Sequence, residues 1–322
     1  MNETQNNFTT RDPLPKWAFI LLLNVHVTIT IIALLGSYLV LRAFHKFRNL
    51  RTASNNILVS LSIADGLLAI PLILDIIQLC LKYSNVGQCP SILKEVGGTV
   101  TLSLFSVIVL HLTLMSSERF IAIKFALRYQ VIVTKGRARI VSIATWLWAL
   151  VVIVAFPEVL QWATGKDCRK FPREMSEVIN TTEVHRIRWH LVFQASSMFL
   201  VPLLIILCSY TYIFIVSYKQ RQHVREQGRY IPGMPTVKHH MKGARTLAIV
   251  VALCLLSIIA LLVVTSLRIF RGISIGDRKH QMLLQNIVYD VAMLLNAICN
   301  PLIYGWKNEE FRNAFRKMLK CC

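Results

Sequence analysis

Long apolar blocks, separated by short polar segments, run through almost the whole chain. Each block has about 20 or more residues, enough for one helix to cross a hydrocarbon core of roughly 30 Å. Only helices or closed barrels satisfy their backbone polar groups in lipid, so these blocks predict an all-α membrane protein, a seven-transmembrane-helix bundle. The predicted spans are Trp17–Ala43, Ala53–Leu81, Pro90–Ile123, Ile140–Gln161, Leu191–Tyr218, Ala244–Leu267 and Met282–Trp306.

The odd number of spans places the two termini on opposite sides of the bilayer. Most of the 36 Lys and Arg residues fall in the loops of one side, which predicts that this side is cytoplasmic and the N-terminus extracellular. The expected organisation is an extracellular segment (residues 1–16), a transmembrane domain (17–306), and a short amphipathic eighth helix with a cytoplasmic tail (307–322). Three glycosylation sequons lie on the predicted outer side, at Asn2, Asn7 and Asn180.

Composition excludes several classes of function. The formal charge of +20 does not indicate nucleic-acid binding, because the basic residues are spread over loops between spans rather than gathered in one domain. Membrane lipid is the expected partner of these basic loops. The sequence has no metal-ligand spacing, no Gly-rich phosphate loop and no nucleophile, base and acid at one depth. We therefore expect no enzyme activity, no cofactor and no metal.

A few polar side chains interrupt the apolar blocks. Asp65 lies deep in the second span with apolar residues on both sides, and ionisable groups at such depth face a bundle interior. Asn296 and Asn300 are four residues apart on one face of the seventh span, where they could meet Asp65. Pro301 follows and predicts a bend, because proline removes a helical hydrogen bond.

Short motifs at the inner ends of two spans carry a family resemblance. The stretch from Asn300 to Tyr304 reads Asn-Pro-Leu-Ile-Tyr, and Glu118-Arg119-Phe120 ends the third span. In this order and at these depths they resemble the rhodopsin-like (class A) G-protein-coupled receptors, and the resemblance spans nearly the whole chain. It implies a plasma-membrane receptor that transduces an extracellular ligand signal to a heterotrimeric G protein by helix rearrangement. A transporter or a non-signalling receptor-like scaffold remains an alternative.

The resemblance also implies roles for individual residues. It implies a central polar network, an outer disulfide and palmitoylation behind the eighth helix, which is predicted over Lys307–Lys320. The coupling and activation switch comprises Glu118, Arg119, Phe120, Tyr210, Asn300, Pro301 and Tyr304. The network comprises Ser37, Asp65, Asn296 and Asn300; the disulfide joins Cys89 to Cys168; the palmitoylated residues are Cys321 and Cys322.

The chain departs from the family pattern in two of its spans. In the first, Gly36 is followed by Ser37 where the family has asparagine, so a hydroxyl replaces a side-chain amide of the polar network. In the sixth, Cys254-Leu255-Leu256-Ser257 replaces Cys-Trp-x-Pro, so the usual switch and kink are missing. An acidic partner for Arg119 in the sixth span is also missing, and raised basal signalling is the resulting hypothesis.

The ligand class is open. Thr101 stands where amine receptors carry an aspartate, which disfavours a biogenic amine, and the seventh span has no lysine for a retinal Schiff base. Acidic residues near the outer mouth favour a cationic small molecule or a basic peptide, with solvated loop acids as the alternative. His111 is expected to be a hydrogen-bonded core histidine rather than a proton sensor. The candidate pocket residues are Asp75, Glu95, Thr101, Tyr289 and Asp290.

Overall fold

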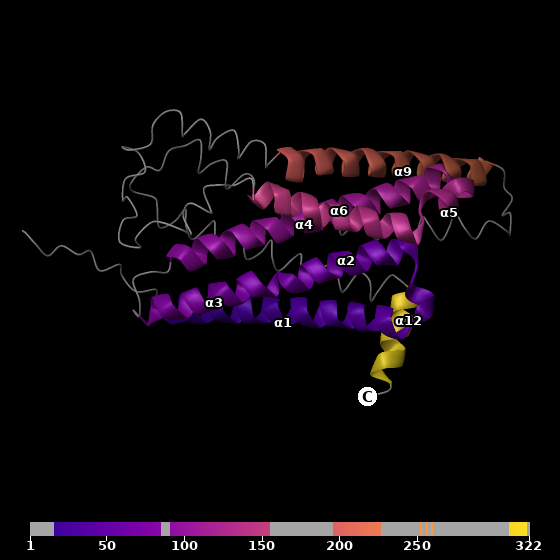
Figure 1. Cartoon of the computed structure of the whole chain (residues 1–322). Coiled ribbons are helices and arrows are strands. Elements are labelled where there is room, and N and C mark those ends of the chain that lie inside the picture. The colour runs from indigo at the N-terminus through magenta and orange to yellow at the C-terminus, as the bar shows by residue number, and fades with distance from the viewer. Residues whose placement is uncertain are drawn as a thin grey trace, which may run out of the picture.

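The computed structural model describes residues 16–84, 91–154, 196–226 and 309–320, with the single positions 252, 256 and 259. Every regular element within these ranges is a helix. The long helices lie alongside one another, and α12 (Glu309–Leu319) crosses the end of α1 (Lys16–Lys46) (Figure 1). The described residues therefore confirm the predicted all-α architecture.

The second predicted span contains two helices rather than one. They are α2 (Ala53–Leu67) and α3 (Ala69–Tyr83), and the break lies at Leu68. Pro71 explains the break, because it has no backbone N–H to donate to the carbonyl oxygen of Leu67 and its ring crowds that carbonyl. The two helices together still form one span over Ala53–Leu81, with the bounds that the sequence predicted.

Helix α4 (Ser91–Lys124) is central to the described bundle. It packs against α2, α3, α6 (Lys135–Val154) and α9 (Val201–Glu226). Its buried side chains recur every three to four residues and form the middle of the core; they include Leu104, Phe105, Ile108 and Leu112. A residue on α4 can therefore contact several other helices at once.

Two helices extend past their predicted ends. Helix α6 begins at Lys135, before the predicted Ile140, because the Thr134 hydroxyl accepts a hydrogen bond from the Arg137 amide at 3.3 Å and caps the first turn. Helix α9 follows a π-helical turn (Ser196–Leu200) and continues to Glu226, eight residues past the predicted end of the fifth span at Tyr218.

The outer surface of the described bundle is apolar. On α1, Leu35 and Tyr38 are 58% and 59% exposed, whereas Ala33 and Val40 on the opposite face are buried. Such a surface suits lipid rather than water. Four helical segments of the described residues are long and apolar enough to cross a membrane: Phe19–Lys46, Ala53–Leu81 (α2 and α3 together), Ser103–Lys124 and Ser196–Lys219.

The remaining predicted spans are described only at isolated positions. Residues 252, 256 and 259 are helical and exposed, and they fall within the predicted Ala244–Leu267 span. The predicted span Met282–Trp306 lies outside the described residues, as does the end of the fourth span after Val154.

Helix α12 is short and strongly amphipathic. Phe311 is fully buried and Ala314 nearly so, while Arg316 and Lys317 are exposed on the other side. The buried side of α12 packs against α1, and the Phe311 and Phe315 rings meet edge to face with centroids 5.9 Å apart. Within Glu309–Leu319 the structure agrees with the predicted amphipathic eighth helix. Short connecting helices, η1 (Arg48–Leu50), η2 (Ala126–Arg128) and α5 (Tyr129–Ile132), complete the described elements.

Candidate functional site

A buried carboxylate lies near the C-terminal end of α4. The Glu118 side chain is only 4% exposed and forms an ion pair with Arg119, whose Nε lies 3.2 Å from Glu118 Oε2. The second carboxylate oxygen, Oε1, accepts a hydrogen bond from the Tyr129 hydroxyl. A nearly buried carboxylate without such partners would be costly, and here Arg119 and Tyr129 supply a partner to each of its two oxygens.

Tyr129 reaches Glu118 because the chain turns back directly after α4. Helix η2 and helix α5 follow within a few residues, and Tyr129 is the first residue of α5. Burial, followed by the charge of Glu118 and the hydrogen bond to it, raises the pKa of the Tyr129 phenol, and Arg119 opposes this more weakly. The phenol therefore remains a protonated donor at physiological pH.

Arg119 connects α4 to α2. Its Nη2 donates a hydrogen bond of 3.1 Å to the Ser54 hydroxyl near the start of α2, and its side chain is 23% exposed. One guanidinium thus holds an acid on its own helix and a hydroxyl on a neighbouring helix. This arrangement can hold one relative position of the two helices until another group competes for the guanidinium.

Aromatic contacts join the same end of α4 to α9. The Phe120 and Tyr212 rings meet edge to face with centroids 4.9 Å apart. The Lys124 ammonium lies 5.2 Å from the Phe120 centroid and 5.8 Å from the Tyr212 centroid, within cation–π range. Tyr210, also on α9, has a buried hydroxyl beside Ser116 with no hydrogen bond of good geometry to described residues.

The central polar residues of α1 and α2 lie close together. Asp65 is 5% exposed and Ser37 is 7% exposed. Gly66, next to Asp65, packs so tightly on α1 that a Cβ atom there would lie 3.1 Å from Ser37 Cβ. The structure thus places Ser37 against the residue that follows Asp65 in the chain. Other predicted network and switch residues, Asn296, Asn300, Pro301 and Tyr304, lie outside the described residues.

The opposite end of the bundle holds part of the predicted pocket. Asp75 on α3 faces α4 at Gly97, where a Cβ atom would lie 4.0 Å from Asp75 Oδ1. One turn further, Thr101 is buried and donates a hydrogen bond of 2.9 Å to the Gly97 carbonyl oxygen. Glu95 is helical in α4. Tyr289 and Asp290 lie outside the described residues.

Gln78 is a candidate pocket residue that the sequence did not indicate. Its amide nitrogen is buried, has no hydrogen-bond partner among the described residues, and lies beside Gly97 one turn from Asp75 on α3. A ligand with an acceptor group could satisfy it. The only sequence signal was a polar residue three positions after Asp75, on the same face of a helix.

A serine connects three helices in the middle of the bundle. The Trp146 ring nitrogen donates to Ser60 Oγ at 3.0 Å, and Ser60 Oγ lies 2.8 Å from His111 Nε2. His111 Nδ1 lies 2.8 Å from the Val107 carbonyl oxygen, which can only accept. If neutral His111 carries its proton on Nδ1, it donates to the Val107 carbonyl oxygen and Ser60 donates to Nε2. Every polar group in this series of hydrogen bonds then has a partner. This supports the expected core role of His111.

Several predicted modification sites fall outside the described residues. They are the disulfide pair Cys89 and Cys168, the sequons at Asn2, Asn7 and Asn180, and the palmitoylation sites Cys321 and Cys322. These assignments remain predictions.

Comparisons with known proteins agree with the sequence motifs. Residues 36–304 match the family described as 7 transmembrane receptor (rhodopsin family). The chain is 27% identical to the adenosine receptor A2a of Homo sapiens over 315 residues, covering 92% of this chain and 72% of that protein. It is 28% identical to the adenosine receptor A2b of Mus musculus (92% and 88% covered) and 26% identical to the octopamine receptor beta-2R of Chilo suppressalis (92% and 79%).

Proposed function

We propose that this chain, which belongs to the rhodopsin family of seven-transmembrane receptors, binds a small molecule at its outer side and releases Arg119 to a G protein. Members of the family are multi-pass membrane proteins that signal through G proteins, and the chain is a receptor of this kind rather than an enzyme. The parts that we propose are the ligand, the orientation and the role of each residue. The contact of Arg119 with both Glu118 and Ser54 carries the proposal.

The proposed orientation places the N-terminus outside and the C-terminus in the cytoplasm of a cell with the receptor in its plasma membrane. The excess of Lys and Arg on one side and three sequons on the other support it. In this orientation the Glu118–Arg119 pair lies at the cytoplasmic end of α4, and Asp75 and Thr101 lie toward the outside. Helix α12 then lies along the inner leaflet.

The proposed resting state is held by the partners of Arg119. Glu118 and Ser54 keep the guanidinium against α2 and α4, and Tyr129 keeps the second inner loop docked on Glu118. Agonist binding moves the helices, the guanidinium leaves these partners, and it becomes available to the G protein. A ligand can drive this change only if it binds the arrangement with the guanidinium released more tightly than it binds the resting state.

The proposed ligand is a small polar molecule. Relatives named for adenosine and for octopamine support this size class. At the outer end, Asp75 offers an acceptor and the Gln78 amide nitrogen an unsatisfied donor, both beside Gly97. An adenine-like ring edge carries both a donor and an acceptor, so we propose adenosine and related nucleosides as the first ligands to test. Octopamine is the second candidate, although Thr101 does not offer a charge for an amine.

The test measures nucleotide exchange on purified G proteins by the full-length receptor in membranes, with nucleosides and amines as agonists. We expect one nucleoside to stimulate exchange, Arg119→Ala to abolish stimulation at unchanged surface expression, and Gln78→Ala to raise the half-maximal concentration. Lys317→Ala, an exposed cation on α12, is the matched control for loss of charge. Full stimulation of Arg119→Ala would refute the role of Arg119, and an unchanged response of Gln78→Ala would refute the pocket.

A further inference from the structure

Lys124, the last residue of α4, lies among three aromatic rings. Its ammonium nitrogen is 5.2 Å from the ring centroid of Phe120, 5.4 Å from that of Phe125 and 5.8 Å from that of Tyr212. All three distances are within the roughly 6 Å over which the face of a ring attracts a cation. Lys124 and these three rings are called the lysine cage below.

The three rings reach Lys124 from different parts of the chain. Phe120 precedes Lys124 by four residues, so the two side chains lie on one face of α4. The chain leaves helical geometry at Phe125, with φ −119° and ψ 44°, and the ring of this residue lies over the ammonium. Tyr212 belongs to α9 and meets Phe120 edge to face, with centroids 4.9 Å apart. The lysine cage therefore connects α4 to α9.

The rings are the partners of the Lys124 charge. In the described part of the chain no carboxylate forms an ion pair with Lys124, and Glu118 on the same helix is paired with Arg119. The predicted sixth span, Ala244–Leu267, also has no acidic residue that could pair with Arg119. The lysine cage is thus a restraint between two helices that needs no acidic residue.

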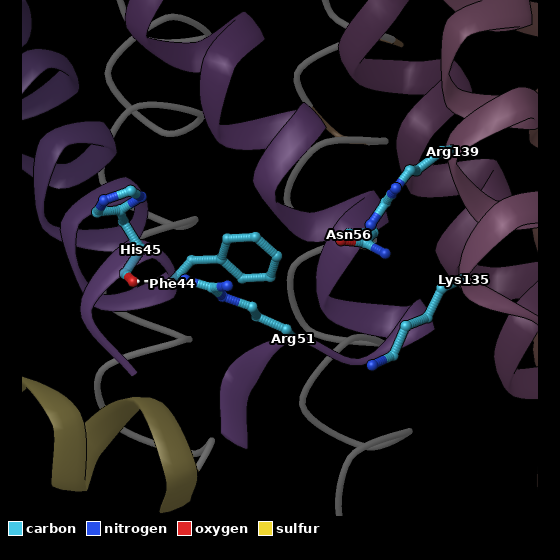
Figure 2. A pocket seen from close by; sticks show the side chains of 6 residues that line it. All are labelled: Phe44, His45, Arg51, Asn56, Lys135 and Arg139. Atoms are coloured by element: carbon cyan, nitrogen blue, oxygen red, sulfur yellow. Dashed lines mark hydrogen bonds between the residues drawn. The ribbon is translucent and has the colours of Figure 1, made fainter. Parts of the chain in front are cut away.

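Other cations at this end of the bundle make different contacts. Several of them line a basic cavity between α1, α2 and α6, and no residue of this cavity belongs to the lysine cage (Figure 2). The cavity is lined by Phe44, His45, Arg51, Asn56, Lys135 and Arg139. The Lys46 ammonium lies 5.9 Å from the ring centroid of Phe47, the next residue in the chain. Among the described residues, Lys124 is therefore the one cation that lies over rings of two different helices.

We propose that Lys124 is a positioning residue for coupling: its ammonium binds the Tyr212 ring and thereby holds the inner end of α9 against α4 in the resting state. This inference rests on the proposed function, because Phe120 directly follows Arg119 and a shift of α9 away from Phe120 opens the bundle beside the guanidinium. Lys124 is exposed, and a cation–π contact at an exposed site changes an equilibrium about two- to fivefold. The Tyr212 contact is the one that crosses to α9, so it sets the expected size of the effect.

The first measurement is nucleotide exchange on the G protein by the full-length receptor without ligand, at matched surface expression. Lys124→Met removes the cation and keeps an apolar stem, so it should raise basal exchange about two- to fivefold. Lys124→Arg keeps a cation that can lie over the rings, so basal exchange should return to the wild-type level. Basal exchange of Lys124→Met equal to that of the wild type would overturn the proposal.

A fluorination series separates the attraction of the cation from the packing of the rings. Fluorine withdraws electrons from the face of a ring and weakens its attraction for a cation, with little change in ring size. Tyr212→Phe is the starting variant, followed by phenylalanine with one, two and three fluorine atoms at position 212. Basal exchange should rise with each fluorine atom when Lys124 is present and stay constant in the Lys124→Met background. The same trend in both backgrounds would assign the contact to packing against Phe120 and refute the role of the cation.

The matched control is Lys46→Met, which removes another exposed cation at the same end of the bundle. Its ring contact is with Phe47, its neighbour in the chain, and joins no two of the long helices. Lys46→Met should leave basal exchange at the wild-type level. An increase equal to that of Lys124→Met would attribute the effect to the loss of positive charge in general and not to the lysine cage.

Hydrogen exchange of the purified receptor, without ligand or G protein, tests the lysine cage apart from coupling. Lys124→Met should accelerate the exchange of backbone amides around Tyr212 in α9 about two- to fivefold, and Lys46→Met should not. Unchanged amide exchange in Lys124→Met would refute the lysine cage. Accelerated amide exchange in a receptor that activates no G protein would support the lysine cage and refute the proposed function.

Discussion

Glu118→Gln tests whether the ion pair holds the resting state. The substitution preserves the side-chain volume but removes the charge that faces Arg119 Nε at 3.2 Å. A hydrogen bond to a charged group contributes about 1.5–3 kcal/mol and a neutral one about 0.5–1.5 kcal/mol. Arg119 is 23% exposed, so water replaces part of the loss. The resting state should therefore weaken by about 1.4 kcal/mol, which is a factor of ten in its equilibrium.

The assay is nucleotide exchange on the G protein without ligand, at matched surface expression. Glu118→Gln should raise basal exchange by up to about tenfold, as long as the active fraction of the wild-type receptor is small. The double variant with Tyr129→Phe closes a thermodynamic cycle, and the two effects should be non-additive because both act on one carboxylate. Basal exchange of Glu118→Gln equal to that of the wild type would refute the reasoning.

The pH dependence of basal exchange tests the protonation of Tyr129, one of the two partners of Glu118. Burial, followed by the charge of Glu118, raises the pKa of Tyr129, so its proton is held more tightly in the folded protein. The phenol is then neutral in both the folded and the unfolded state below pH about 10, and its stabilising contact is lost only above that value. The effect of Tyr129→Phe on basal exchange should be constant between about pH 6 and pH 9; a titration in that window would contradict the assignment.

Three further predictions concern packing, each read by thermal unfolding or hydrogen exchange of the purified receptor. In Gly66→Ala the added Cβ atom meets Ser37 on α1 at 3.1 Å, an overpacking cost of about 1–3 kcal/mol that exceeds the helix-propensity gain of about 0.5–1 kcal/mol, so the bundle should be destabilised by about 0.5–2 kcal/mol. Gly136→Ala, with open space, keeps only the gain and should stabilise α6 slightly. Ser60→Ala leaves two ring nitrogens unpaired and should cost about 1–3 kcal/mol, more than Ser62→Ala, which loses only a bond to its own helix. Phe311→Ala should accelerate hydrogen exchange in α12, because this fully buried ring fixes the helix to α1. Equal unfolding temperatures within either pair, or unchanged exchange in α12, would contradict the packing described.

Much of the fold was predictable from the apolar blocks, because span length follows from bilayer thickness alone. The break at Leu68 was also within reach, since Pro71 stands inside an apolar block. The early start of α6 depended on the cap by Thr134, which has no signal stronger than a single threonine. Helix ends are decided by such local hydrogen bonds rather than by hydropathy.

The candidate site was predictable only where its residues are neighbours in the chain. Glu118 and Arg119 are adjacent, so their pairing could be inferred. Ser54 contacts Arg119 across 65 positions of sequence, and no periodicity connects them. The basic cavity likewise joins residues near Arg51 to residues near Lys135, and only the packing of α2 beside α6 brings these two segments together.

The break at Leu68 also divides one span into two helices, α2 and α3, that make different contacts. Helix α3 carries Asp75 and takes its direction from α1 and α4, while α2 carries Ser54 and reaches Arg119. A change of side chain in α3 can thus alter the proposed ligand pocket while α2 keeps its contact with Arg119. The proposed pocket and the proposed coupling contact can therefore vary independently, although both lie on one span.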